Sequence, residues 1–526
     1  MWARCLWQGL TGAVLIAVLW GGQLASAASA RKDAQTGQSA RGRTNVKEAG
    51  PKEAPTRQSP GSRAGGKEAK PTDLAGELDA ALMPAGLKAT VGACVVEVPS
   101  GRVIYEHNAD EPLTPASNMK LLTTAVALDQ LGADHRLRTR LLRNGDTLAL
   151  VGGADPAFGD PNIAERLGID RTADYAQWVK ALQACGTAGQ IRNLTFDDSI
   201  LDSQWRHPSW SPKEYQHWYC APVGGLVLND SCVDVAVEPA DGRTTPILLP
   251  PCSLFQVINK STVGKGGAVV VSRPQDGWQL IVSGRCSGRT RPSSVTVPDP
   301  GMFAASVLYD MLKGQCCPEI QPPRREKITD QAGDVPAGWE VVGTAESQLT
   351  DVLQRCNTDS QNLFAEMLMK LNGAVATGCP GSWANGRLAV AQFLRRHDLP
   401  AEGVYVDDGS GLSAGNRVTA RLLALLLCRM RERTDWDTWR NSLAVGGDSG
   451  TLRRRFRGEL ENKVFGKTGY INGVSSLSGY IEVRPEQYVA FSFIYNNVSG
   501  RISPRQAQDN ACRVLYRQIA GDKSDE

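Results

Sequence analysis

The sequence contains few histidines and lacks the residue patterns that hold a metal ion. Only five histidines occur among 526 residues, and they are scattered along the chain. They are His107, His135, His207, His217 and His397. The sequence contains no H-E-x-x-H, and its cysteines and histidines show no spacing typical of a zinc site. We therefore expect an activity that needs no metal ion and no cofactor.

The sequence also lacks a strong charge of either sign. Lys and Arg number 58 against 55 Asp and Glu, which gives a formal net charge of +3. Residues 31–72 alone hold ten basic and four acidic residues, a net +6, so residues 73–526 are slightly acidic. Because the folded part has no excess of positive charge, nothing indicates a nucleic acid as a partner.

After the first 30 residues, no apolar run is long enough to cross a membrane. Residues 1–30 are typical of a secretory signal peptide: they contain Arg4, a short apolar stretch and two A-x-A sites. An uncleaved N-terminal anchor is the alternative. We expect an exported protein that works in the periplasm or outside the cell.

Residues 31–72 contain many Gly, Pro, Ser, Lys and Arg residues and almost no large apolar ones. This composition is typical of a disordered linker, because it cannot bury enough apolar surface to fold. A plain solvated spacer is one interpretation. The other is a spacer that associates weakly with anionic polymers of the cell envelope.

Thirteen cysteines are typical of a disulfide-containing protein from an oxidising compartment. Cys5 lies in the expected signal peptide, so twelve remain. Seven fall in residues 139–344 and five lie outside that range, and both counts are odd. Either one disulfide joins the two groups or some thiols stay free, and the pairing stays open.

Three short motifs follow one another in a fixed order. They are Ser117-Asn118-Met119-Lys120, Ser360-Gln361-Asn362 and Lys467-Thr468-Gly469, which read S-x-x-K, S-x-N and K-T-G. The first alone is weak, because a serine before a helical run is also an ordinary helix cap. All three in this order are typical of the active site of a penicillin-recognising serine acyltransferase.

The residue types of the first motif fit nucleophilic catalysis. A serine hydroxyl is a poor nucleophile until a neighbouring base takes its proton. Lys120 follows Ser117 by three residues in a helical run, so it lies about one turn away on the same face. A lysine acts as a base only where burial or a nearby cation lowers its pKa, and Lys467 is a candidate for that cation.

The second motif would move a proton and hold the substrate. We expect Ser360 to relay a proton between Lys120 and the leaving amine. Asn362 would hydrogen-bond Lys120 and the substrate amide. The alternative is that both residues only cap the helical run that follows them.

The third motif ends a strand-like run and would bind the substrate's carboxylate through Lys467 and Thr468. Gly469 would let the substrate approach the strand edge closely. The backbone N–H groups of Tyr470 and Ser117 would form an oxyanion hole. The alternative is a charged residue beside a glycine bulge in a surface strand.

With these motifs the chain resembles the class C low-molecular-mass penicillin-binding proteins, the D-alanyl-D-alanine carboxypeptidase/endopeptidase family. Residues 151–156, 219–226 and 408–413 also match segments of that family, and the resemblance covers about residues 75–520. It implies a serine DD-peptidase that cleaves the terminal D-Ala from peptidoglycan stem peptides through an acyl-enzyme. It also implies cleavage of D-Ala–meso-diaminopimelate cross-links and covalent inhibition by β-lactams.

One specificity residue is implied by the same resemblance. Relatives carry an acidic residue that faces the free amine of the diamino acid in the stem peptide. Glu214 is the residue of this chain that resembles it. The alternative is a glutamate in a surface loop.

The order of the expected elements predicts an α+β fold. A hairpin near residues 92–105 and a three-strand meander after residue 463 would form one antiparallel sheet with helices on its faces. The resemblance implies a β-lactamase/transpeptidase-like domain split by a large, mostly β insertion. The expected divisions are 1–30 signal peptide, 31–72 linker, 73–138 and 345–526 penicillin-binding domain, and 139–344 inserted domain.

Three other functions compete with this prediction. Residues 447–450 read G-D-S-G, as in chymotrypsin-like proteases, but Thr451 stands where those enzymes have glycine. A β-lactamase would share the motifs, but those chains are shorter and lack the insertion. A non-catalytic protein that binds the cell wall or β-lactams is the third alternative.

Overall fold

The computed structural model describes residues 73–274, 277–330 and 334–521. The expected signal peptide and the expected linker lie outside the described residues. Among the residues that are described, no helix combines the length and the apolar character needed to cross a membrane.

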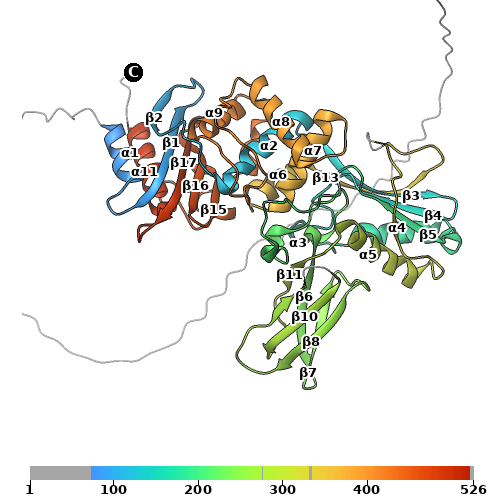
Figure 1. Cartoon of the computed structure of the whole chain (residues 1–526). Helices are drawn as coiled ribbons and strands as arrows, with labels where there is room; N and C mark the ends of the chain where they lie inside the picture. The colour runs from blue at the N-terminus through green and yellow to red at the C-terminus, as the bar shows by residue number, and fades with distance from the viewer. Residues whose placement is uncertain (1–72, 275–276, 331–333, 522–526) are drawn as a thin grey trace, which may run out of the picture. The chain divides into compact units, whose positions relative to one another are not determined.

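A six-stranded sheet organises the two ends of the described chain (Figure 1). Its strand order is β14-β15-β16-β17-β1-β2, and every neighbouring pair is antiparallel. The bounds are Lys88–Glu97 (β1), Val103–His107 (β2), Ala444–Val445 (β14), Val464–Ile471 (β15), Val474–Arg484 (β16) and Gln487–Ser499 (β17). The predicted hairpin and the predicted meander are therefore confirmed, and β17 pairs with β1 to join them.

Both faces of this sheet are buried, as the sequence of β17 illustrates. Val489, Phe491 and Phe493 alternate along the strand and pack in one apolar core. Ala490 and Ile494 point to the other face and belong to a second core. Because successive side chains of a strand point to opposite faces, a sheet with two apolar faces needs helices on both sides.

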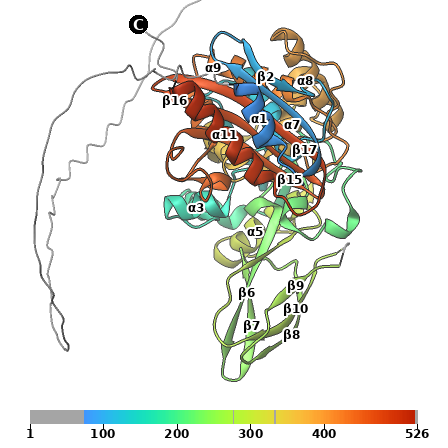
Figure 2. The same ribbon diagram turned by 90° about the vertical axis from the view of Figure 1, so that its left-hand side faces the viewer.

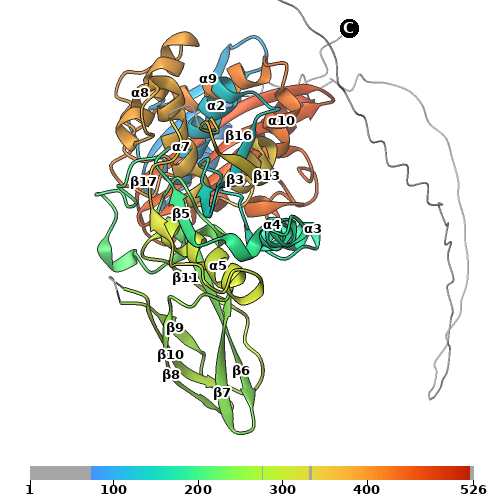
Figure 3. The same cartoon turned by 90° about the vertical axis from the view of Figure 1, so that its right-hand side faces the viewer.

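Helices cover each face. On one side lie α1 (Leu74–Leu82) and α11 (Pro504–Gly521), which pack against each other (Figure 2). On the other side lie α2 (Met119–Leu131), α6 (Leu349–Asn357), α7 (Asn362–Thr377), α8 (Trp383–Arg396), α9 (Ala420–Arg431) and α10 (Trp436–Ser442) (Figure 3). The arrangement confirms the predicted α+β class.

The sequence predicts a helical segment from about residue 349 to 371, and this prediction is wrong at one point. The structure breaks it into α6 and α7, and the second motif lies in the loop between them. Ser360 has φ +63°, a left-handed conformation that cannot continue a right-handed helix. Ser360 therefore lies in a loop, and α7 begins at Asn362.

A long inserted segment separates α2 from α6. It contains a five-stranded sheet in the order β12-β5-β4-β3-β13 and two three-stranded sheets, β11-β6-β7 and β8-β10-β9. The strands are Arg136–Asn144 (β3), Thr147–Val151 (β4), Asn193–Asp197 (β5), Cys232–Ala240 (β6), Arg243–Leu249 (β7), Gln256–Val263 (β8), Val270–Ser272 (β9), Gln279–Cys286 (β10), Ser293–Thr296 (β11), Arg324–Arg325 (β12) and Glu340–Gln348 (β13). Its helices are Pro161–Leu167 (α3), Ala173–Ala184 (α4) and Pro300–Gln315 (α5).

The expected disulfides are not found in the described part of the chain. All twelve cysteines there are free thiols, and nine of them are buried. Most fill apolar cores as small hydrophobic side chains, as Cys94 does in β1 and Cys512 does in α11. The neighbouring sulfur atoms of Cys316 and Cys317 lie 3.5 Å apart, well beyond the length of about 2.05 Å of a disulfide bond.

The core under α11 gives a test of the fold. Leu515 is fully buried between this helix and the sheet. We expect Leu515→Ala to lower the free energy of unfolding by about 2–5 kcal/mol, because it removes apolar contacts and leaves a cavity. Urea denaturation measures this change.

The matched control is Leu167→Ala, since Leu167 is 60% exposed. A change within about 0.5 kcal/mol is expected there. Equal losses for both variants would contradict the packing described for α11.

Candidate active site

The three motifs meet at one place in the structure. Ser117 lies in the 3-10 turn Ala116–Asn118 that leads into α2. The Lys120 amine nitrogen lies 3.1 Å from Ser117 Oγ and 2.7 Å from Asn362 Oδ1. The Lys467 amine nitrogen, on β15, lies 2.8 Å from Ser360 Oγ. Residues more than 240 positions apart in the sequence therefore form one polar cluster.

Gly469 allows the Ser117 turn to pack tightly against β15. A Cβ atom at this position would lie 2.2 Å from Ser476 Oγ, 2.7 Å from Pro115 O and 3.0 Å from Ser117 N. Any side chain would push the nucleophile's turn away from the strand. This is a different reason for glycine from the predicted close approach of substrate, which stays a prediction.

Lys120 is fully buried and makes a third contact, 2.8 Å from its amine nitrogen to the Ser410 carbonyl oxygen. Burial lowers the pKa of Lys120 to about 8, because a low-dielectric interior disfavours the charged amine. Burial and then the neighbouring Lys120 charge lower the pKa of Lys467 well below its usual range. The effect of Lys120 on Lys467 is thus present, whereas the expected effect of Lys467 on the pKa of Lys120 stays a prediction.

The three contacts of Lys120 orient a neutral amine. The oxygens Asn362 Oδ1 and Ser410 O can only accept hydrogen bonds, so they use both hydrogens of the amine. The Asn362 amide is held the right way round because its Nδ2 donates to the Tyr219 carbonyl at 2.9 Å. The charged amine donates to Ser117 Oγ, whereas in the neutral amine the lone pair would be left for the Ser117 hydroxyl hydrogen, the arrangement that a general base and its nucleophile need.

The loop that supplies the Ser410 carbonyl was not predicted as part of the site. The Glu366 carboxylate accepts hydrogen bonds from Gly409 N at 2.9 Å and Ser410 N at 2.8 Å. Burial, and next the Asp408 charge, raise the pKa of Glu366 to about 7. The sequence signal was the D-G-S-G-L-S segment, which resembled the family but suggested no role.

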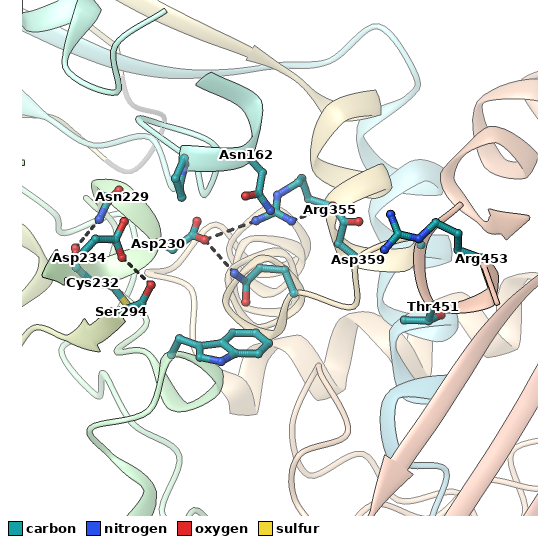
Figure 4. Close-up of a pocket in the computed structure, with 14 residues that line it drawn as sticks. Asn162, Asn229, Asp230, Cys232, Asp234, Ser294, Arg355, Asp359, Thr451 and Arg453 are labelled. Atoms are coloured by element: carbon teal, nitrogen blue, oxygen red, sulfur yellow. Dashed lines mark hydrogen bonds and ion pairs between the residues drawn. The ribbon is translucent and has the colours of Figure 1, made fainter. Parts of the chain in front are cut away.

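A buried ionic cluster ties the inserted segment to the second motif (Figure 4). Arg355, in the last turn of α6, donates to Asp160 through Nε at 3.0 Å and Nη2 at 2.8 Å. Its Nη1 lies 2.7 Å from Asp359, next to Ser360. Gln361, on the other side of Ser360, donates to Asp230 Oδ2 at 2.8 Å. The loop that carries Ser360 is therefore held on both sides.

Asp230 reaches Gln361 from a strained backbone. Asn229, Asp230 and Ser231 have φ values of +52°, +56° and +53°, three left-handed residues in a row without a glycine. Each such residue costs about 1–3 kcal/mol and commonly marks a functional site. Burial, and next the Asp160 carboxyl, raise the pKa of Asp230 well above its usual range. No short sequence motif indicates this cluster, so it could not be predicted from the sequence.

The remaining residues of the third motif lie beside Ser117 and Ser360. Thr468, Gly469 and Tyr470 line a cavity of about 650 Å³ together with Ser117 and Ser360. The Tyr470 side chain is 67% exposed, and the Arg505 guanidinium lies 5.5 Å from its ring centre.

Glu214 does not line this cavity. Its carboxylate accepts a hydrogen bond from the Tyr219 hydroxyl, and His217 Nε2 lies 3.8 Å away. It is therefore connected to Asn362 only through Tyr219.

The serine of the G-D-S-G segment, Ser449, has a structural role. Ser449 Oγ accepts a hydrogen bond from Val445 N at 3.1 Å and so closes the turn after β14. This contact accounts for the serine without a catalytic role.

A serine beside a buried lysine, a second lysine on a sheet edge and an S-x-N loop between them define the class of penicillin-binding serine enzymes. The model of the D-Ala-D-Ala carboxypeptidase 3 (S13) family matches residues 74–518. The chain belongs to this family and is a serine-type carboxypeptidase.

Relatives and solved structures agree. The D-alanyl-D-alanine carboxypeptidase of Actinomadura sp. (strain R39) is 31% identical over 487 residues, which are 86% of this chain and 86% of that protein. Penicillin-binding protein 4 from Haemophilus influenzae has a TM-score of 0.65 at 20% identity, over 85% of this chain and 99% of that one. The same protein with a bound β-lactam has a TM-score of 0.60 at 19% identity, over 84% of this chain and 98% of that one. The fold is thus that of a penicillin-binding protein, as predicted.

The pKa of Lys120 predicts how acylation depends on pH. The amine must be neutral to accept the Ser117 proton, and its pKa is lowered to about 8. We expect the rate of acylation by penicillin to rise by up to about tenfold per pH unit between about pH 6 and 8, and to level off above. Stopped-flow mixing with a chromogenic β-lactam measures the rate. A flat profile, or a rate that falls as pH rises, would contradict the role of a neutral lysine.

Gly469→Ala tests the packing of the nucleophile's turn. The added Cβ would displace Ser117 N or Ser476 Oγ, and a shift of about 1 Å can slow a reaction about 100-fold. We expect acylation to slow by about that factor while the protein stays folded, as circular dichroism would show. The control is Gly189→Ala, where a Cβ would meet no atom within 4 Å. Acylation at the wild-type rate in Gly469→Ala would refute the argument.

Proposed function

We propose that Ser117 is the nucleophile of a DD-peptidase reaction and that Lys120 is its base. Lys120 takes the hydroxyl proton while Ser117 Oγ bonds to the carbonyl carbon of the penultimate D-Ala. The amide C–N bond then breaks, the leaving amine takes a proton, and an acyl-enzyme remains. Water hydrolyses the ester in a second step and restores the serine.

Ser360 is the proposed route for the proton to the leaving amine. It would pass the proton that Lys120 has taken to the leaving nitrogen, and its hydroxyl accepts a hydrogen bond of 2.8 Å from the Lys467 amine. Lys467 and Thr468 would hold the terminal carboxylate of the substrate. A bound carboxylate would favour the charged form of Lys467 and so offset the effect of burial on its pKa.

The remaining roles concern the substrate's other groups. The backbone N–H groups of Ser117 and Tyr470 would bind the oxygen that becomes negative during attack. Asn362 would bind the substrate amide as well as Lys120. Glu214 stays our candidate for the amine of the stem's diamino acid, and it would act beside Tyr219, to which it is bonded.

The proposed substrates are peptidoglycan stem peptides that end in D-Ala-D-Ala, and also D-Ala–diaminopimelate cross-links. β-Lactams would acylate Ser117 and stay attached. The family description and the names of the relatives support this choice of substrate. Such a substrate lies outside the cytoplasm, so we propose that residues 1–30 direct export to the periplasm or beyond, with 31–72 as a spacer.

The observation that carries the proposal is the 3.1 Å contact between the Lys120 amine and Ser117 Oγ. Intact-mass measurement after mixing with penicillin should show the addition of one molecule, mapped to the peptide that contains Ser117. Ser117→Ala should abolish both this labelling and the release of D-Ala, because catalytic groups that act as a unit fail together.

Ser449→Ala is the control, and it should be labelled like the wild-type protein. Release of D-Ala that persists in Ser117→Ala, or labelling that maps to Ser449, would overturn the proposed mechanism.

A further inference from the structure

A second cavity, of about 540 Å³, adjoins the catalytic one. The two share Gly450, Thr451 and Arg453 as lining residues. Asp359 and Gln361, the neighbours of Ser360 in the sequence, line the second cavity, while Ser360 itself lines the first. The two cavities therefore adjoin at these three shared residues and at the loop of Ser360.

The walls of this second cavity come from two parts of the chain (Figure 4). The inserted segment contributes Trp218, Asp234 and Ser294. Across from them lie Thr451 and Arg453, from the turn after β14. Trp218, Ser294 and Arg453 make no hydrogen bond or ion pair with Lys120, Ser360 or Asn362 in the described part of the chain.

Most charged groups around the cavity are already paired. Asp234 accepts from Arg171 at 2.6 Å, and Asp359 accepts from Arg355 at 2.7 Å. Arg453 is different, because its guanidinium has no hydrogen-bond or ion-pair partner among the described residues. Trp218 is also unusual, since 46% of this large apolar residue is exposed. A free guanidinium and an open indole ring are typical parts of a binding site, because they bind carboxylates and aliphatic chains.

The position of Ser360 indicates which part of a substrate would lie in this cavity. In the proposed reaction Ser360 delivers the proton to the leaving nitrogen, so that nitrogen lies beside it. Whatever is attached to the leaving nitrogen then extends past Ser360, toward Asp359 and Gln361. A single departing D-Ala is too small to reach across a cavity of this size. A second peptide linked through the leaving nitrogen would enter it.

We propose that this cavity binds the leaving peptide of a cross-linked substrate, the stem whose side-chain amine is released. Arg453 pairs with a carboxylate of that peptide, and the Trp218 ring packs against its aliphatic side chain. This inference rests on the proposed function and adds to it a site for the longer of two substrates.

The test compares a cross-linked muropeptide dimer with a linear N-acylated peptide that ends in D-Ala-D-Ala. We expect Trp218→Ala to raise KM for the dimer about tenfold or more, because buried Trp anchors often carry over 1 kcal/mol. Its kcat/KM for the linear peptide should stay within about twofold of wild type. Arg453→Ala should impair the dimer more than the linear peptide. Liquid chromatography with mass spectrometry follows both products.

Arg457→Ala is the matched control, since Arg457 is exposed and lines neither cavity. It should leave both substrates unaffected. A second measurement uses the released stem peptide as an inhibitor of linear-peptide hydrolysis. Its inhibition constant should rise about tenfold or more in Trp218→Ala.

Equal losses on both substrates, or no loss on the dimer, would overturn the inference. So would a wild-type enzyme that hydrolyses the linear peptide and leaves the dimer intact. In each case penicillin would still label Ser117 if the proposed function is right. Failure of that labelling would refute the proposed function instead, so the two outcomes are distinguishable.

Discussion

The rest of the site depends on the hydrogen bonds of the buried Lys120 amine. This amine contacts two carbonyl oxygens, from Asn362 and Ser410, and the Ser117 hydroxyl, and in the neutral form its lone pair would face Ser117. Those oxygens come from α7 and from the loop that follows α8, so helices far apart in the sequence must pack to within hydrogen-bond distance. Moving either oxygen would rotate the amine, and the same burial that fixes it also keeps its pKa low.

Burying two lysines close together is unfavourable, and the surrounding fold has to stabilise that arrangement. Lys467 lies on β15, in a sheet whose two faces are both covered by helices, so packing on both sides fixes its position. Lys120 lies on α2, between this sheet and α7. The loop of Ser360 lacks such support from regular structure. Its support comes from Arg355 and Gln361, through Asp160 and Asp230 of the inserted segment.

The sequence could predict what local spacing determines. S-x-x-K places a lysine one turn after a serine, and alternating apolar residues predict the meander that carries Lys467. The left-handed backbone of Ser360 could not be predicted, because the cap residues around it indicate a helix start but not this conformation. Nor could the pair of Arg355 and Asp160, which are 195 positions apart. The contact of Lys120 with the Ser410 carbonyl uses a backbone atom, so no residue type could indicate it.

The chain's connectivity places the inserted segment next to the Ser360 loop. The chain leaves the catalytic domain after α2 and returns through β13, which pairs with β3 along its length. β13 ends at Gln348 and α6 begins at Leu349, without a linker between them. The other end of α6 is the Ser360 loop. An inserted segment joined to this helix, and bonded to its last turn through Asp160, adds its surface next to Ser360. In the reaction that we propose, an insertion at this point therefore adds surface where the leaving group would lie.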